Sequence, residues 1–255
     1  MGRLRARLTR GAGPAYDGPV LILAIDTSAA ASAAVLSQPS TDCPSEVLAS
    51  FETTETNTHS EVLAPGIDSL LTEAGIAGTE LDGIVVGVGP GPFTGLRVGI
   101  ATARTLGFVW GIPVHGVMSL DAIAWDVMSE RVRGGRAASG DGGFCVAIDA
   151  RRKELYWARY TAAGELVDGP QVGTAETLPA LPMHGAGAGL YAERLEAVGA
   201  RVDPGFAERR PAAASLGAWA IRVLGRGQEL LSTTPLYLRE SDAKVPRQMK
   251  GTPAS

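Results

Sequence analysis

The stretch VLILAIDTS (20–28) decides the fold, because a matching stretch occurs in the other half of the chain. In the first stretch an apolar run long enough for a β-strand ends at Asp26 and meets a turn. FCVAIDARR (144–152) repeats this pattern and ends its apolar run at Asp149, about half the chain later. A second strand-length segment follows each turn. The repeat predicts two related lobes, each beginning with a strand, an aspartate, a turn and another strand.

Around these repeats, strand-length apolar runs alternate with helical patterns, which is typical of an α/β fold. Apolar residues recur at three- and four-residue spacing between Glu61 and Ala74, and a second helix is predicted over 96–110. The glycine-rich turn GPGPFTG (89–95) leads into this second helix, and HGAGAGL (184–190) echoes it in the other half. A late helix is predicted over 212–224. Each lobe therefore combines strands with helices.

Composition divides the chain into five segments. Residues 1–19 are rich in Arg, Gly and Pro without an apolar period, so a disordered arm is expected there. The N-terminal lobe is expected over 20–128 and the C-terminal lobe over 144–240. The Arg/Gly/Ser-rich stretch 129–143 is predicted to link them. Residues 241–255 are expected to form a disordered tail.

Composition also excludes several classes of protein. The 255 residues carry 23 basic and 27 acidic side chains, and a net charge of −4 does not favour autonomous binding to nucleic acid. Two cysteines and three histidines are too few and too widely spaced for a disulfide framework or a zinc site, so no metal site is expected. No apolar run approaches the ~18 residues of a membrane span. A cytoplasmic protein without membrane contact is expected.

The aspartates that end the two repeats have two possible roles. A carboxylate at a strand end can orient a metal-bound phosphate, and two such turns facing across a cleft hold nucleotides in two-lobed phosphotransferases. Asp is also an ordinary turn residue, and neither turn has the glycine that would let backbone N–H groups approach a phosphate. Both roles stay open for Asp26 and Asp149. The basic run 151–153 is interpreted as a solvated face, unless its position against a strand and a turn makes it an RNA contact.

The glycine-rich turn 89–95 is specific as a sequence but poorly suited to hold a phosphate. It opens a helix whose N–H groups could favour an anion. However, Pro90 and Pro92 have no N–H to donate, and the lysine of a P-loop is missing. A rigid turn with Thr94 as a helix cap is favoured. The candidate residues of a vestigial nucleotide site are Asp26, Thr27, Gly89, Gly91, Thr94 and Asp149.

The helix predicted over 96–110 is apolar almost all round, with Arg97 and Arg104 as its charged residues. Such a helix is buried on two sides. Small residues recur every four positions from Gly95 to Gly107, which would let another backbone pack closely. One side must contact its own sheet. The other side could contact a partner, although burial wholly within the lobe is equally compatible with the sequence.

Several motifs together resemble one family. ILAIDTS (22–28), LDGIVVGVGPGPFTGLRVGIATARTLG (81–107), DARRKELYWARY (149–160) and PLYLR (235–239) are similar to segments of the TsaB family of tRNA threonylcarbamoyladenosine biosynthesis proteins. The resemblance runs in order from about Val20 to Arg239. It implies a duplicated, two-lobe actin-like ATPase (ribonuclease H-like) fold with mixed sheets flanked by helices, which agrees with the internal repeat.

The resemblance also implies a role without catalysis. Members of this family partner TsaD, the subunit that transfers threonylcarbamoyl to the adenosine 3′ of the tRNA anticodon, and the ATPase TsaE joins them. No cofactor of its own is expected, whereas ATP and metal are expected on TsaD and TsaE, and tRNA is expected to be an indirect partner, through the complex. A homodimer is expected without TsaD. The interface is implied on the helices near 61–74 and 96–110, with candidate residues Leu63, Ile67, Leu70, Leu71, Leu96, Gly99, Ile100, Ala103 and Gly107.

The alternative is an enzyme, a small-molecule kinase or ATPase of the same fold. The two aspartates and the glycine-rich turns are the argument for it. Tight binding and turnover of ATP by the isolated chain would distinguish it from a partner subunit.

Overall fold

The computed structural model describes residues 19–40, 42–53, 59–134 and 142–239. The expected arm (apart from Pro19), the expected tail and residues 135–141 of the expected linker lie outside the described residues. Within the described residues, no helix is long and apolar enough to cross a membrane.

The first lobe is built on a mixed five-stranded sheet. Its strands are β1 (Val20–Asp26), β2 (Ser32–Gln38), β3 (Glu46–Glu52), β4 (Gly83–Gly87) and β5 (Val114–Val117), in the spatial order β3-β2-β1-β4-β5. The three strands β1, β2 and β3 form an antiparallel meander, while β4 and β5 run parallel to β1. β1 is buried on both faces because it is the central strand, and this explains its nearly continuous apolar sequence.

The second lobe repeats this topology. Its strands are β6 (Phe144–Asp149), β7 (Glu154–Tyr160), β8 (Leu166–Thr174), β9 (Pro182–His184) and β10 (Arg201–Val202). Read from β8, their order is β8-β7-β6-β9-β10, the same arrangement as in the first sheet, again with an antiparallel meander followed by parallel neighbours. The duplicated two-lobe actin-like fold is therefore confirmed.

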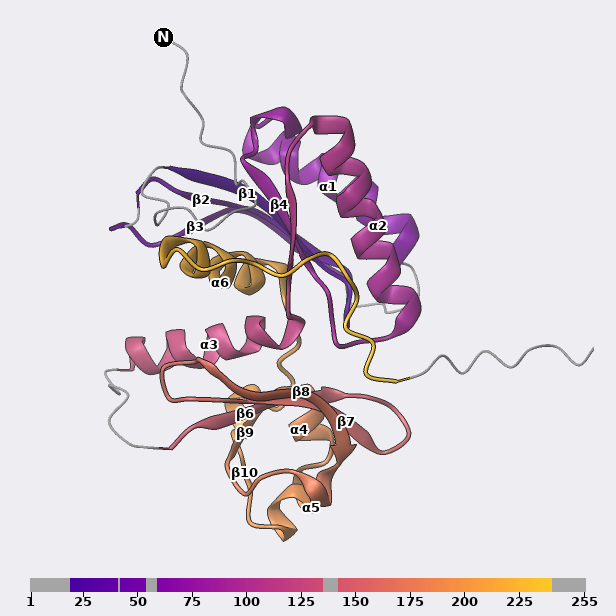
Figure 1. The fold of residues 1–255 in the computed structure, drawn as a ribbon, viewed down its shortest axis with the longest axis vertical. Helices are drawn as coiled ribbons and strands as arrows, with labels where there is room; N and C mark the ends of the chain where they lie inside the picture. Colours follow the sequence, from indigo (N-terminus) through magenta and orange to yellow (C-terminus); the bar gives the residue numbers. More distant parts are fainter. Residues whose placement is uncertain (1–18, 41, 54–58, 135–141, 240–255) are drawn as a thin grey trace, which may run out of the picture.

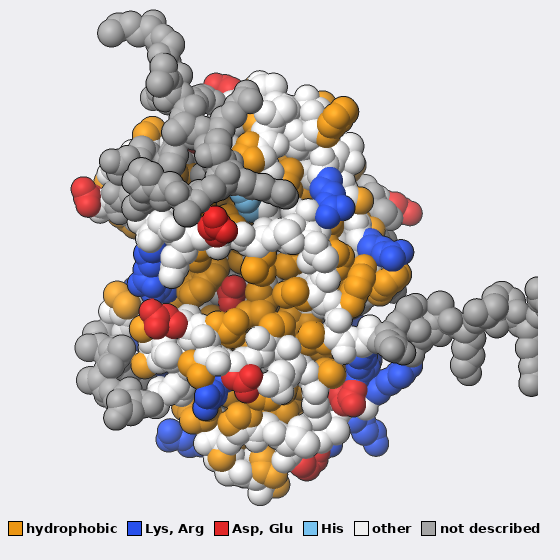
Figure 2. Space-filling model, in the orientation of Figure 1, with side chains coloured by type: hydrophobic (Ala, Val, Ile, Leu, Met, Phe, Trp, Pro, Cys, Tyr) orange, Lys and Arg blue, Asp and Glu red, His pale blue; other side chains and the backbone are white. Residues whose placement is uncertain are grey.

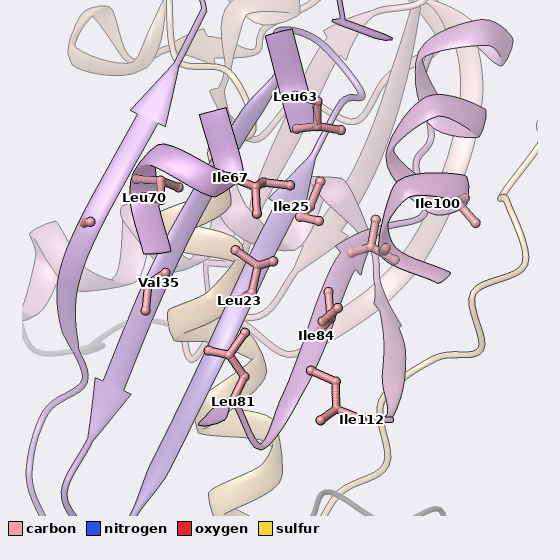
Figure 3. Packing of buried hydrophobic residues seen from close by; sticks show 14 of the residues in the cluster. Leu23, Ile25, Val35, Leu63, Ile67, Leu70, Leu81, Ile84, Ile100 and Ile112 are labelled. Carbon is pink, nitrogen blue, oxygen red and sulfur yellow. The ribbon is translucent and has the colours of Figure 1, made fainter. Parts of the chain in front are cut away.

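Two helices cover one face of the first sheet, α1 (His59–Ala74) and α2 (Phe93–Trp110) (Figure 1). Gly75 and Gly111, each with φ of 65°, follow the two helices in the left-handed conformation that lets a helix end. Ile67 of α1 lies near Ile25 of β1, and Leu70 lies over Val35 of β2 (Figure 3).

Two further helices, α3 (Ser119–Arg133) and α6 (Ala213–Gly225), lie between the sheets (Figure 1). They pack against each other, and apolar side chains gather between the lobes on the face shown in Figure 2. In the second lobe the short helices α4 (Ala186–Leu190) and α5 (Ala192–Ala197) follow β9, so the expected glycine-rich turn into a helix is present there. Single turns of 3₁₀ helix lie at Gly78–Glu80, Ala175–Thr177 and Pro204–Phe206.

The structure corrects the expected lobe boundaries. Helix α6 comes from the segment assigned to the C-terminal lobe, but it packs against β1 and β2 and buries Leu216 and Ile221 beside Ile22. Helix α3 comes from the segment assigned to the N-terminal lobe, and it buries Leu120 and Ile123 against the second sheet. Each lobe contributes to the other one's core because each sheet has a second apolar face that its own segment leaves uncovered.

The expected linker also begins too early. Helix α3 continues through residues 129–133 and ends at Gly134, whose N–H donates to the carbonyl of Glu130. Glu130, Arg131 and Arg133 are good helix formers, so the change to a polar composition did not mark the end of the helix.

Asp121 of α3 joins three elements between the sheets. It accepts a hydrogen bond from the Tyr160 hydroxyl of β7 (2.9 Å) and one from the Trp219 side chain of α6. Burial raises the pKa of Asp121 from its usual 3.8 to about 7, although both hydrogen bonds act to lower it.

His184 at the end of β9 is buried, and its pKa shifts in the opposite direction to that of Asp121. Its ring packs edge-on against Phe144 and Phe206, and within the described residues neither ring nitrogen has a hydrogen-bond partner. Burial lowers the pKa of His184 from its usual 6.5 to about 4; Asp203 opposes the shift and Arg131 adds to it.

These two groups predict opposite pH dependences. His184 binds a proton more readily in the unfolded state than in the folded state. Above pH 6.5 it is neutral in both states and does not lower stability. As the pH falls from 6.5 to 4, protonation of the unfolded state lowers the free energy of unfolding by about 3 kcal/mol. Asp121 is protonated more readily when folded, so its contribution is lost as the pH rises toward 7. Urea unfolding at pH 7 and pH 4.5 should show that His184→Met loses less stability on acidification than the unsubstituted chain, whereas Asp121→Asn loses more. Two variants with the unsubstituted pH dependence would contradict the assignment.

Candidate functional site

The turn after β1 is held together by the Asp26 carboxylate, which is completely buried. One oxygen, Oδ1, accepts hydrogen bonds from the Ser28 N–H (2.8 Å) and hydroxyl (2.6 Å). The other, Oδ2, accepts one from the Ser119 hydroxyl (2.7 Å) at the start of α3. Burial raises the pKa of Asp26, although the hydrogen bonds from Ser28 and Ser119 act to lower it.

The glycine-rich turn closes on the same carboxylate. The Gly89 N–H donates to Ser119 Oγ (3.2 Å), and the Ser119 N–H donates to the Gly89 carbonyl (2.8 Å). A Cβ on Gly87 would lie 1.9 Å from Asp26 Oδ2, and one on Gly91 would lie 2.9 Å from the Ser28 carbonyl oxygen. These glycines therefore allow the chain to contact the aspartate turn directly, and the space next to the carboxylate is filled by the chain itself.

Thr27 connects this turn to α2. It is completely buried, and its hydroxyl donates to the Gly95 carbonyl (2.8 Å) in the first turn of the helix. Of the six residues expected in a vestigial nucleotide site, the structure brings Asp26, Thr27, Gly89 and Gly91 into this one connected group. Thr94 is exposed and lies inside α2, after Pro92 at the N-cap, so it is not the expected cap.

Asp149, the counterpart in the second lobe, has a different environment. Its side chain is 29% exposed, accepts a hydrogen bond from the Arg151 N–H (2.9 Å) and lies 3.7 Å from the Arg151 guanidinium. Tyr191 also donates to it. Asp149 is thus partnered within its own lobe, and the contacts of Asp26 and Asp149 do not join them in one site.

The C-terminal segment 231–239 spans the two lobes. The Leu236 N–H donates to the Val88 carbonyl (2.8 Å), next to the glycine-rich turn, and the Leu236 side chain packs against the cores of both lobes. Arg239 donates to the Ala150 carbonyl (2.9 Å) and pairs with Glu154. The chain's own residues therefore connect the two turns that would face a nucleotide.

The hydrogen bonds around Asp26 connect parts of the chain to one another and do not leave an open ligand site. Both oxygens of Asp26 already accept hydrogen bonds from the protein, and the carboxylate is completely buried, so it is not accessible to a metal or a phosphate in this arrangement. Among the described residues, no three His, Cys, Asp or Glu side chains are grouped to hold a metal ion.

Comparison with known proteins identifies the family. A family model described as TsaD, tRNA N6-adenosine threonylcarbamoyltransferase, matches residues 46–203. YeaZ (TsaB) from Pseudomonas aeruginosa superimposes with a TM-score of 0.68 at 30% identity, covering 86% of this chain and 100% of that one. The chain belongs to the TsaB (YeaZ) family.

Two sequence relatives add to this comparison. A tRNA threonylcarbamoyladenosine biosynthesis protein, TsaB of Escherichia coli, is 34% identical over 139 residues, which are 54% of this chain and 54% of that protein. An uncharacterized protein of Mycobacterium leprae is 39% identical over 233 residues, which are 88% of this chain and 56% of that protein. The chain thus matches only about half the length of these two relatives.

The residues expected at the TsaB-family interface lie on the inner face of the helices. Of the nine, only Leu71 is merely half-buried. The small-residue stripe faces the chain's own sheet: a Cβ on Gly99 would lie 2.3 Å from Thr27 Oγ1, and one on Gly107 would lie 2.2 Å from Val114 Cγ2. Buried within the lobe are Leu63, Ile67, Leu70, Leu96, Gly99, Ile100, Ala103 and Gly107. Most of the expected set is therefore not exposed on this chain, because α1 packs on β2 and β3 and α2 packs on β1, β4 and β5. That these two helices form the interface stays a prediction.

The outer face of α2 exposes apolar residues that sequence reasoning did not single out. Phe108 is 89% exposed, Val109 67% and Phe93 40%. Helical periodicity did not find them because α2 is apolar on both sides, so the sequence contains no phase that distinguishes the inner face from the outer one. The sequence signal that could have indicated them is that α2 has more apolar residues than one buried face requires.

The inner stripe generates a stability prediction. Gly99→Leu should cost about 1–3 kcal/mol of unfolding free energy, because the new side chain overlaps Thr27 in the space between α2 and β1. Ala101→Leu is the matched control, since Ala101 is exposed two residues later on the same helix. Urea unfolding of both variants checks the prediction. Equal stability of the two would mean that the stripe does not face the sheet.

Proposed function

We propose that this chain is a non-catalytic subunit of tRNA threonylcarbamoyladenosine synthesis, which binds and activates a TsaD-type threonylcarbamoyltransferase. Membership of the TsaB family supports the pathway, and the exposed apolar outer face of α2 is the observation that carries the partner role. The same proposal includes a TsaE-type ATPase as a further partner, ATP and metal on those partners, tRNA contacted through the complex, and a cytoplasmic location. It also includes a homodimer through the same face when TsaD is absent.

The outer face of α2 has the properties of a partner surface. Phe108 and Val109 are largely exposed at the end of the helix. About one and two turns earlier, Thr105 and Ala101 are exposed and small enough for a partner helix to approach. A shallow hollow of about 500 Å³ lies beside Phe108 and includes Pro113 in its lining. Aromatic side chains that become buried in a complex are enriched among interface hot spots, and Phe108 is available for such burial.

The two arginines of α2 bind the C-terminal segment 231–239. Arg104 donates from Nε to the Thr233 hydroxyl (2.8 Å) and from Nη2 to the Thr233 carbonyl (2.9 Å). Arg97 donates from Nε to the Tyr237 hydroxyl (3.1 Å) and stacks on Phe93 at 3.7 Å from the ring centre. Both guanidinium groups therefore bind the C-terminal segment, and Arg104 also lines the hollow beside Phe108.

The filled aspartate turn supports the non-catalytic part of the proposal. A kinase or ATPase of this fold needs an accessible carboxylate at the end of the first strand, whereas Asp26 is completely buried and accepts hydrogen bonds from Ser28 and Ser119. Tight binding and turnover of ATP by the isolated chain would overturn this part and support the enzyme alternative.

Size-exclusion chromatography with light scattering, on the chain mixed with TsaD from the same organism, tests the partner role. A stoichiometric complex that replaces any homodimer is expected. Formation of threonylcarbamoyladenosine in tRNA by TsaD and TsaE at the full rate without this chain would contradict activation.

Phe108→Asp should abolish this complex, because a carboxylate would be buried in an apolar interface without a partner. Val132→Asp is the matched control: Val132 is 79% exposed at the end of α3, far along the chain from α2. Both variants should keep the unsubstituted melting temperature, since both side chains are exposed. Equal weakening of the complex by the two variants would show that the interface does not lie on α2.

A further inference from the structure

The turn between β6 and β7 has an unusual backbone. Arg151, Arg152 and Lys153 are consecutive residues with φ of 63°, 54° and 63°. The turn is closed by a hydrogen bond from the Ala150 N–H to the Glu154 carbonyl (2.9 Å) and by one from the Glu154 N–H to the Arg151 carbonyl (3.0 Å). Within the described residues, all other positive φ angles belong to glycines.

This backbone is unfavourable for the residues that occupy it. The left-handed conformation crowds the Cβ of an L-residue, and tight hairpin turns with positive φ are usually made from Asn, Asp and Gly. The three side chains are exposed, so burial of apolar surface does not offset the cost. Local folding therefore does not explain three basic residues at this turn, and backbone strain of this kind is often found at functional sites.

Further charged side chains, most of them in ion pairs, surround the turn. Arg239 donates to the Ala150 carbonyl, and Arg194 donates to the Lys153 carbonyl (3.5 Å) and stacks near Tyr191. The charged side chains linked to the turn are Arg151, Arg152, Lys153, Arg194 and Arg239 on one side and Asp149, Glu154 and Glu176 on the other. Arg194 pairs with Glu176, Arg239 pairs with Glu154, and Arg151 lies 3.7 Å from Asp149, so this group keeps an excess of two positive charges in a chain with a net charge of −4.

We propose that the 151–153 turn is a contact for the phosphate backbone of RNA. This inference rests on the proposed function, in which tRNA is the substrate of the complex. Guanidinium groups pair with phosphate oxygens in a two-pronged geometry, and ammonium groups neutralise them as point charges. A narrow hairpin tip with exposed cations brings these groups to a phosphate backbone without any contact between RNA and the acidic remainder of the surface.

The test replaces the turn with residues that accept its conformation. The variant Arg151→Asn, Arg152→Asn, Lys153→Gly removes three positive charges and relieves the left-handed backbone. Arg201→Gln, Arg210→Gln, Arg226→Gln is the matched control, which removes three exposed positive charges elsewhere on the chain. Binding of an unmodified tRNA transcript to each isolated full-length chain is measured between 50 and 200 mM NaCl, together with the melting temperature.

For the turn variant, Kd for tRNA should rise about fivefold or more at 50 mM NaCl. The slope of log Kd against log[NaCl] should fall by an amount that corresponds to up to about three released counterions. Its melting temperature should stay the same or rise, because Asn and Gly accept positive φ. The control should bind tRNA nearly as well as the unsubstituted chain. No measurable tRNA binding by the unsubstituted chain, equal losses in the two variants, or a lower melting temperature of the turn variant would overturn the proposal.

A separate measurement distinguishes RNA from an acidic protein surface. The turn variant should still form the complex with TsaD in light scattering. Loss of that complex with unchanged tRNA binding would assign the turn to a protein partner and overturn the RNA contact. Because tRNA binding is measured on the chain alone, absence of a TsaD complex for the unsubstituted chain would contradict the proposed function without deciding the role of the turn.

Discussion

The buried carboxylate of Asp26 is the interaction on which the first lobe depends. It connects the end of β1, through Ser28 and Ser119, to the glycine-rich turn and to the start of α3. Three segments far apart in the sequence thus meet at one side chain. An Asp at this place in a two-lobed fold is suited to phosphate chemistry, but here its hydrogen-bonding capacity is used to hold the chain together.

The exchange of helices between lobes is the second constraint. Because α6 covers the first sheet and α3 covers the second, separation of the lobes would expose the apolar faces of both. The segment 231–239 adds a further connection, since it contacts the glycine-rich turn at Leu236 and the second lobe at Arg239. Such a body is suited to presenting a rigid surface on α2, and less suited to the opening and closing that nucleotide exchange requires.

Much of the fold could be predicted from the sequence, because the strongest signals were local. The apolar runs ending at Asp26 and Asp149 identified the repeat, and Gly75 and Gly111 marked the ends of α1 and α2 correctly. The exchange of α3 and α6 could not be predicted, since periodicity shows that a helix has an apolar face but not which sheet it covers. The accessible face of α2 was missed for a related reason, and the conformation of Arg151 was missed because nothing in its residue type indicates positive φ.

The position of α6 in the chain has a consequence for synthesis on the ribosome. β1 is among the first elements to be made, but Leu216 and Ile221, which cover one of its faces, are made nearly two hundred residues later. During most of translation the first sheet therefore has an uncovered apolar face. Domains usually fold as they emerge, N-terminal first. In this protein the N-terminal lobe reaches its final packing only after α6 has left the exit tunnel, and until then its exposed sheet is a surface for chaperones or for aggregation.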